Sequence, residues 1–144
     1  FGVGKQVFYL GDTKFFGGPI SSRAAKYGQV IPVDMEAKLY NALQLSAYVL
    51  RTGKILCVFP EGSRSRDGRI KDFKKGVSII AKELNLPLVP VAITGTFEMM
   101  RPGQLFPRPG KVSVTFGQPL YPGGMTYEEI TKKLYGEVVG LLEK

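Results

Sequence analysis

One segment, residues 55 to 84, constrains the fold of this chain more than any other. The short apolar run Ile55–Val58 is partly β-branched and lies between a glycine and a proline, which predicts a buried β-strand. From Phe73 to Leu84 apolar residues recur at helical spacing, and Asp72 is placed to cap the first turn. Open α/β sheets are built from such strand-loop-helix units, and they bind ligands in the loops at the carboxyl ends of their strands.

The loop in this unit is rich in groups that bind anions. Between Glu61 and Lys75 six residues are basic and three are acidic. The basic residues are Arg64, Arg66, Arg69, Lys71, Lys74 and Lys75. The planar fork of arginine suits bidentate binding of phosphate, and glycines let backbone amides come close to an anion. The loop therefore predicts an anion site, with phosphate as its ligand.

The charge of the whole chain narrows the classes of partner. A net charge of +8 over 144 residues predicts attraction to nucleic acid, to an anionic membrane surface or to a phosphorylated substrate. The sequence has no zinc-ligand spacing, no aromatic RNA-recognition motif and no clear helix-turn-helix, so we expect no nucleic-acid partner. No apolar run approaches the roughly 20 residues that span a bilayer. A solvated basic surface without a special role is the remaining alternative.

Two residue counts limit the chemistry. The chain contains no histidine, so no mechanism that needs an imidazole base at neutral pH can run on these residues alone. Its one cysteine, Cys57, lies in the apolar strand and is expected to be a small buried side chain in a reducing compartment. We predict no metal site and no cofactor. We expect a single domain over residues 1–144, truncated at its N-terminus, since the chain starts at Phe1 as the C-terminal part of a longer protein would.

The rest of the chain alternates predicted strands and helices. Strands are expected over residues 7–10, 30–33, 88–93 and 111–116, and helices over 15–27, over 36–50 and from the capping box Thr126–Glu129 onwards. Pro32 predicts an edge strand or an irregular strand, because proline has no N–H to donate. The helix over 36–50 is apolar nearly all round, which predicts burial on several sides. We therefore expect an α/β fold with a largely parallel central sheet flanked by helices.

A connection rich in glycine and proline, residues 97–109, carries apolar side chains. They are those of Met99, Met100, Leu105 and Phe106, among others. Such residues can form a lid, face a membrane or fold back onto the core, which is the commonest outcome. The sequence leaves these three interpretations open.

Residues 59–65, F-P-E-G-S-R-S, resemble the F-P-E-G-T-R-S block of the glycerolipid acyltransferases. This is the family of 1-acylglycerol-3-phosphate and glycerol-3-phosphate acyltransferases. Only the threonine differs, and Ser63 keeps its hydroxyl group. Flanking segments look like further blocks of the family in the same order, namely 15–17, 28–34, 73–76 and 89–93. The resemblance covers residues 7 to 120 and implies the α/β fold of that family.

The resemblance also implies an activity. Members transfer a fatty acyl group from acyl-CoA or acyl-acyl-carrier-protein to the hydroxyl of a lysophospholipid or glycerol phosphate, in phospholipid synthesis or remodelling. Their general base is the histidine of a His-x4-Asp motif, which this chain lacks and which we expect upstream of Phe1. No catalytic residue is therefore assigned here, and the chain alone is expected to be inactive.

Substrate contacts follow from the resemblance position by position. They are assigned to Glu61, Gly62, Ser63, Arg64, Ser65 and Pro90. Arg64 would bind the phosphate of the acceptor, with the hydroxyl groups of Ser63 and Ser65 as donors to its oxygens. Lys75, inside the block 73–76, is a further candidate contact.

Some residues of this region have a second interpretation. Glu61 would shape the pocket together with Gly62, or it would be an ion-pair partner that orients Arg64. Pro90 would hold the strand that lines the acyl or acceptor path. Arg66 and Arg69 lie outside the matched block, and a solvated face explains them equally well.

The sequence departs from the family pattern at one further place. The second block of the family usually ends in an arginine, and here that slot falls on Asp34 or Met35. A carboxylate there would repel a phosphate, which favours a lysophospholipid with a zwitterionic head group as acceptor. Arg23 could substitute for the missing arginine.

Other functions compete with acyl transfer. The chain could be a non-catalytic module that binds anionic lipid, or a nucleic-acid binder that uses the basic residues between Glu61 and Lys75. A nucleotide-binding loop is less favoured, because the pattern G-x-x-x-x-G-K-[ST] is absent. For the acyltransferase we expect a peripheral position at the cytoplasmic face of a membrane, since lysolipids lie in bilayers and a charge of +8 favours anionic head groups.

Overall fold

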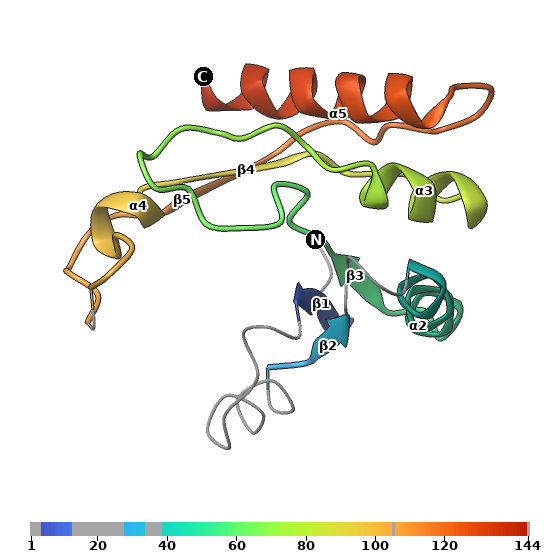
Figure 1. Ribbon diagram of the computed structural model, residues 1–144, viewed down its shortest axis with the longest axis horizontal. Helices are drawn as coiled ribbons and strands as arrows, with labels where there is room; N and C mark the ends of the chain where they lie inside the picture. The colour runs from blue at the N-terminus through green and yellow to red at the C-terminus, as the bar shows by residue number, and fades with distance from the viewer. Residues whose placement is uncertain (1–3, 13–27, 34–38, 105, 144) are drawn as a thin grey trace. The chain divides into compact units, whose positions relative to one another are not determined.

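The computed structural model describes residues 4–12, 28–33, 39–104 and 106–143 (Figure 1). Contacts group the chain into two compact units, residues 1–59 and 60–144, and each is described by itself. The predictions for residues 15–27, for Arg23 and for Asp34 lie outside the described residues. The single domain over 1–144 stays a prediction.

The first unit is a three-stranded parallel sheet with one described helix. Strands β1 (Val7–Asp12), β2 (Val30–Val33) and β3 (Ile55–Cys57) are arranged in the order β2-β1-β3, and α2 (Leu39–Arg51) leads into β3. The three predicted strands are confirmed. So is the edge position predicted from Pro32, because β2 pairs only with β1 among the described strands.

Helix α2 buries one stripe rather than several sides. Ala42, Ser46 and Val49 are buried, whereas Tyr40 and Tyr48 are 70% and 66% exposed. The expectation of burial on several sides is wrong, because the tyrosines carry their rings on the opposite face. Residue Gly53, with φ +74°, ends the helix, as its sequence position indicates. Cys57 is half-buried rather than fully buried, and burial raises the pKa of its thiol.

The second unit is a two-stranded antiparallel sheet that carries two longer helices. Its elements are α3 (Gly76–Glu83), β4 (Val91–Thr94), the single turn α4 (Thr96–Met99), β5 (Ser113–Phe116) and α5 (Tyr127–Leu142). Strands β4 and β5 pair with Ala92 opposite Thr115. Figure 1 shows α5 running alongside β4. The predicted α/β class is confirmed, and the parallel strands are those of the first unit.

The core of this unit lies between α3, α5 and β4. Its buried apolar side chains are those of Val77, Ile80, Ala81, Ala92, Leu120, Ile130 and Leu134. The hydroxyl groups of Ser78 and Thr131 lie 2.6 Å apart and join α3 to α5. The rings of Phe73 and Tyr135 meet edge to face, with centroids 5.2 Å apart. The segment before α3 is thus fixed against the C-terminal helix.

Three predicted boundaries in this unit are wrong. The strand predicted over 111–116 begins only at Ser113. Helix α3 begins at Gly76, so Asp72 does not cap it, and Lys75 occupies the N-cap position without a side-chain capping bond. The backbone N–H of Lys74 instead donates to the carbonyl of Pro60 at 2.8 Å, which keeps this segment in the loop. The strand predicted over 88–93 is continuous only from Val91, since Pro90 has no N–H to pair.

The capping box at the start of α5 is confirmed. Thr126 accepts a hydrogen bond from the backbone N–H of Glu129 at 3.3 Å, and the Glu129 carboxylate accepts one from the backbone N–H of Thr126 at 2.7 Å. The bonds from Thr126 also lower the pKa of the Glu129 carboxyl group. The backbone N–H groups of Thr126 and Glu129, at the start of the helix, therefore both have acceptors.

Replacing Thr126 with alanine tests this cap. We expect Thr126→Ala to lower the free energy of unfolding by about 1 kcal/mol, because the N–H of Glu129 loses its acceptor. Urea denaturation followed by circular dichroism measures the change. Thr126→Ser keeps the oxygen and should stay close to the parent chain. An alanine variant as stable as the serine variant would show that the cap does not stabilise α5.

No described helix combines the length and the apolar character that crossing a membrane requires.

Candidate functional site: the anion-binding loop

The loop from Pro60 to Lys74 is closed by two hydrogen bonds at its base. The backbone N–H of Lys74 donates to the carbonyl of Pro60 at 2.8 Å. The backbone N–H of Lys71 donates to a carboxylate oxygen of the half-buried Glu61 at 2.9 Å. Glu61 therefore braces the loop, a role that neither sequence-based interpretation included. Its contact with a ligand stays a prediction.

Gly62 lets a lysine side chain lie directly against the turn. Its φ of +69° belongs to the left-handed region that favours glycine. A Cβ atom at this position would lie 2.8 Å from Cε and 3.0 Å from Nζ of Lys74. The ammonium group of Lys74 thus lies beside the backbone of the turn, where it adds positive charge to the predicted anion site.

A second ammonium group, that of Lys71, contacts Ser63 and Arg64 of the same turn. Nζ of Lys71 donates to the hydroxyl oxygen of Ser63 at 2.8 Å and to the backbone carbonyl of Arg64 at 3.2 Å. Because Ser63 accepts this bond, its own hydroxyl hydrogen is available to a ligand. This geometry suits the predicted role of Ser63 as a donor to phosphate oxygens.

Arg64 is exposed and only partly engaged. One terminal nitrogen of its guanidinium group donates to the backbone carbonyl of Met100. Among the described residues no carboxylate pairs with Arg64. Its charge is therefore not neutralised within this part of the chain, and the remaining N–H groups can bind an anion.

The hydroxyl hydrogen of Ser65 is already donated within the loop, so it is not free to bind a phosphate. The hydroxyl group donates to a carboxylate oxygen of Asp67 at 3.0 Å, and the backbone N–H of Arg69 donates to the same oxygen at 3.1 Å. These bonds, the one from Arg69 first, lower the pKa of Asp67. The carboxylate keeps both bonds at neutral pH and loses them only as the pH falls through the lowered pKa. A bond from Ser65 to phosphate would need this contact to open.

Two other predicted residues are engaged elsewhere in the unit. The ammonium group of Lys75 forms an ion pair with Glu128 of α5, which lowers the pKa of that carboxyl group. Pro90 is less than 2% exposed, and its carbonyl accepts a hydrogen bond from the backbone N–H of Gly117 at 2.8 Å. Direct contact of Pro90 with a ligand is not supported by this burial. A supporting role for its strand stays a prediction.

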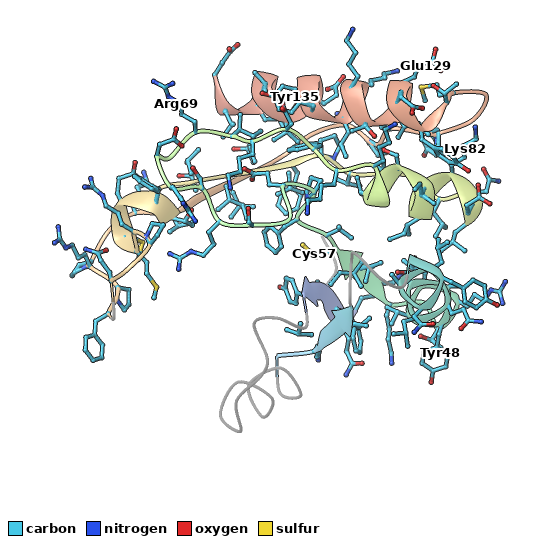
Figure 2. The ribbon with its side chains drawn as sticks, in the orientation of Figure 1. Tyr48, Cys57, Arg69, Lys82, Glu129 and Tyr135 are labelled. Atoms are coloured by element: carbon cyan, nitrogen blue, oxygen red, sulfur yellow. The ribbon has the colours of Figure 1, made fainter. Side chains whose placement is uncertain are left out.

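Arg66 and Arg69 are both exposed on the loop. Figure 2 shows the Arg69 side chain extending away from the ribbon of the loop. This arrangement suits the interpretation of a solvated face for Arg69. The ammonium groups that lie against the turn at 61–64 are instead those of Lys71 and Lys74, and Arg64 extends from the turn to the carbonyl of Met100.

Comparison with known proteins identifies the family. The chain matches the family described as Acyltransferase over residues 2–94, which is more than half of its length. The chain belongs to the acyltransferase family. The resemblance seen in F-P-E-G-S-R-S is thereby confirmed.

Named relatives of this acyltransferase chain come from plants and other organisms. The 1-acyl-sn-glycerol-3-phosphate acyltransferase of Limnanthes douglasii is 41% identical over 75 residues, which are 52% of this chain and 27% of that protein. The enzyme of the same name from Cocos nucifera is 34% identical over 94 residues, 65% of this chain and 30% of that protein. The chain spans about a third of the length of the curated relatives that it matches.

A solved acyltransferase structure has a similar fold. It is the crystal structure of PlsC, the 1-acyl-sn-glycerophosphate acyltransferase of Thermotoga maritima. The TM-score is 0.75 at 27% sequence identity, and the alignment covers 94% of this chain and 55% of that chain. The similarity supports the predicted α/β class of this acyltransferase chain.

Sequence reasoning missed three components of the site. Lys71 and Lys74 were counted only as basic residues, and the carbonyl of Met100 was not considered. The spacing of Lys71 from the F-P-E-G block carries no signal, because its contact depends on how the loop closes. The glycine at position 62 was the available signal for Lys74, since a left-handed turn without a side chain leaves room for a neighbour. Among the described residues no three metal-binding side chains come together.

Proposed function

We propose that this chain forms the acceptor-binding part of an enzyme that transfers a fatty acyl group to the free hydroxyl of 1-acyl-glycerol-3-phosphate. The acyl donor would be a thioester, acyl-CoA or acyl-acyl-carrier-protein. The observation that carries the proposal is the closed loop whose turn bears Arg64 and is contacted by the side chains of Lys71 and Lys74. Relatives named as 1-acyl-sn-glycerol-3-phosphate acyltransferases support it.

The charges of the loop favour a phosphate monoester over a zwitterionic head group. A monoester presents three terminal oxygens and up to two negative charges, which three cations and the hydroxyl of Ser63 can match. A phosphodiester such as that of lysophosphatidylcholine carries one negative charge beside a cation. The zwitterionic alternative depends on Asp34, which lies outside the described residues. We therefore propose lysophosphatidate as the acceptor.

The reaction needs a group to take the proton of the attacking hydroxyl. An alcohol is a poor nucleophile at neutral pH, and a thioester can be attacked without a metal once the alcohol is activated. The chain has no histidine to serve as base. We propose that residues 1–144 bind the acceptor without turning it over, and that the His-x4-Asp motif of the family supplies the base in the complete enzyme. A peripheral position at the cytoplasmic face of a membrane completes the proposal.

Isothermal titration of the 144-residue chain tests acceptor recognition. We use lysophosphatidate with a short acyl chain, below its micellar concentration, and compare lysophosphatidylcholine and monoacylglycerol with the same chain. Saturable binding of lysophosphatidate is expected, at least about tenfold tighter than that of the other two, because each lost charge-assisted hydrogen bond costs about 1.5–3 kcal/mol. Equal affinities for the three lipids would contradict a phosphate site in the loop.

A second candidate function is that of a non-catalytic module that binds anionic lipid. It is considered because the chain contains no histidine. A thiol-release assay with acyl-CoA and lysophosphatidate separates the two. The 144-residue chain should release no thiol under either proposal. The protein expressed from its complete reading frame should release thiol if it is an acyltransferase. Binding without release by that protein would favour the lipid-binding module.

A further inference from the structure

An exposed aromatic side chain marks the segment after α4. Phe106 is 81% exposed, more than any other large hydrophobic residue that the structure describes. Three prolines, Pro102, Pro107 and Pro109, lie within four residues of it. A phenylalanine held in water at this level costs free energy that a covering apolar layer would recover. The segment is one that the proposed transfer chemistry does not use.

The charges around Phe106 are all of one sign. Arg101, Arg108 and Lys111 are exposed. The sequence contains no acidic residue between Glu98 and Glu128. The described residues 101–104 and 106–111, which we call the basic loop, therefore carry exposed cations before and after one exposed aromatic residue in the chain. A surface with negative charges on the outside and an apolar layer beneath them would bind both the cations and the ring.

Hydrogen bonds hold the base of the basic loop in place. The backbone N–H of Arg108 donates to the carbonyl of Met99 at 2.7 Å. The backbone N–H of Arg101 donates to the side-chain oxygen of Gln104 at 2.9 Å, and the N–H of Gln104 donates to the carbonyl of Arg101 at 3.1 Å. These bonds hold the backbone at Arg101, Gln104 and Arg108, which flank Phe106 in the chain.

The basic loop is joined to the anion-binding loop. Arg64 donates to the carbonyl of Met100, one residue before the basic loop begins. The Arg101 guanidinium lies over the ring of Phe97, 5.4 Å from its centroid, and a Cβ atom on Gly68 would lie 3.0 Å from the same ring. A surface that took up Phe106 would therefore meet the protein close to its phosphate-binding arginine.

We propose that the basic loop binds anionic lipid bilayers and inserts Phe106 at the level of the head groups. This proposal rests on the proposed function in one respect, that the acceptor is a lipid of the bilayer. The negative surface potential of an anionic bilayer attracts the three cations, and the acyl region just below it takes the ring. Arg64 is then held at the depth where the phosphate of a lysolipid lies.

A single-stranded nucleic acid would offer negative charge and bases for stacking. Proteins that bind such strands repeat aromatic platforms along a basic groove. Between Phe97 and Phe116 the sequence carries one aromatic residue, Phe106. A bilayer is therefore the partner that this segment fits better.

A fluorescence experiment tests the proposal directly. The chain contains no tryptophan, so Phe106→Trp introduces a single reporter into the 144-residue protein. With vesicles of phosphatidylcholine containing about 30 mol% phosphatidylglycerol, we expect a blue shift of the emission and quenching by brominated acyl chains. Pure phosphatidylcholine vesicles should give little change. Tyr121→Trp, at a position that is 68% exposed in the same unit, is the matched control and should not shift.

Charge variants measure the electrostatic part. Removing two cations with Arg101→Gln and Arg108→Gln should weaken partitioning onto the anionic vesicles roughly 25-fold, about fivefold for each. Lys132→Gln with Lys133→Gln removes the same charge from exposed positions on α5 and should weaken it by less than about threefold, because charges beyond a Debye length are screened.

Several outcomes would overturn the proposal. They are a failure of the anionic vesicles to bind, equal shifts of the two tryptophan reporters, and a shift that appears with protein concentration alone or with single-stranded DNA in place of vesicles. The proposed function fails separately. Loss of lysophosphatidate selectivity in titrations, with the emission shift of the Phe106→Trp variant intact, would count against the acceptor site and not against the basic loop.

Discussion

Replacement of Arg64 by alanine is expected to lower kcat/KM for lysophosphatidate by about a hundredfold or more in the protein expressed from its complete reading frame. The guanidinium group has N–H donors that no described carboxylate engages, and a phosphate would take two of them in a bidentate contact. Two charge-assisted hydrogen bonds of about 1.5–3 kcal/mol each account for this loss. Most of it should appear in the KM of the acceptor, because binding of the phosphate precedes the chemistry at the hydroxyl.

Neighbouring arginines provide the matched controls. Arg66→Ala and Arg69→Ala remove the same charge from exposed positions on the same loop and should change the KM by less than about threefold. Arg64→Lys keeps the charge but loses the planar fork, so an intermediate KM is expected. Steady-state kinetics with the acceptor varied at saturating acyl-CoA measures these values. An unchanged acceptor KM in Arg64→Ala would remove Arg64 from the phosphate site.

Replacement of Gly95 by alanine is expected to lower the free energy of unfolding by about 3 kcal/mol or more. Gly95 follows β4 with φ +85°, and a Cβ atom there would lie 2.0 Å from the backbone carbonyl oxygen of Lys111. A left-handed conformation costs a non-glycine residue about 1–3 kcal/mol, and the clash adds to this because a backbone atom must move. The connection between β4 and β5 would have to open to relieve it.

Gly103 separates the steric from the conformational part of this cost. It has a similar φ of +91°, but nothing lies within 4 Å of the position of its Cβ atom. Gly103→Ala should therefore cost about 1 kcal/mol, the conformational part alone. Urea denaturation of both variants gives the two free energies. Equal losses at the two positions would show that the chain relieves the contact with Lys111 without cost.

Local signals in the sequence were sufficient for much of the fold. The apolar runs that form β1, β2 and β3 and the capping box at Thr126 were predicted because each depends on residues adjacent in the chain. The position of Pro32 on an edge strand follows from a missing N–H, which is a property of one residue. These features need no knowledge of distant contacts.

Features that depend on distant contacts were not predicted. Asp72 has the side chain of a helix cap, but the bond from Lys74 to Pro60 holds the backbone in a loop until Gly76. The antiparallel pairing of β4 with β5 is set by the connection that folds back at Gly95, which the apolar pattern of the strands does not reveal. Tertiary contacts thus overrode local preference at both places.

The candidate site, too, was predicted only where it depends on residues that are adjacent in the chain. The anion site was placed in this loop because six basic residues lie between Glu61 and Lys75, and the block F-P-E-G-S-R-S gave the resemblance to the family. The partners of Glu61, Ser63 and Ser65 could not be predicted, since each depends on the closed shape of the loop. Pro90 was assigned to the substrate path, and the structure buries it against Gly117.

The attachment of α5 to α3 bears on how this protein can be divided. The family match ends at residue 94, whereas the side chains that pack against the loop-bearing helix α3 come from residues near the C-terminus. Ile130, which is fully buried, and Tyr135, labelled in Figure 2, both lie beyond that limit. A piece cut where the family match ends would keep every residue of the F-P-E-G-S-R-S block and lose the helix that packs against the segment after it. Boundaries drawn for expression or for domain shuffling should therefore include α5 to its end at Leu142.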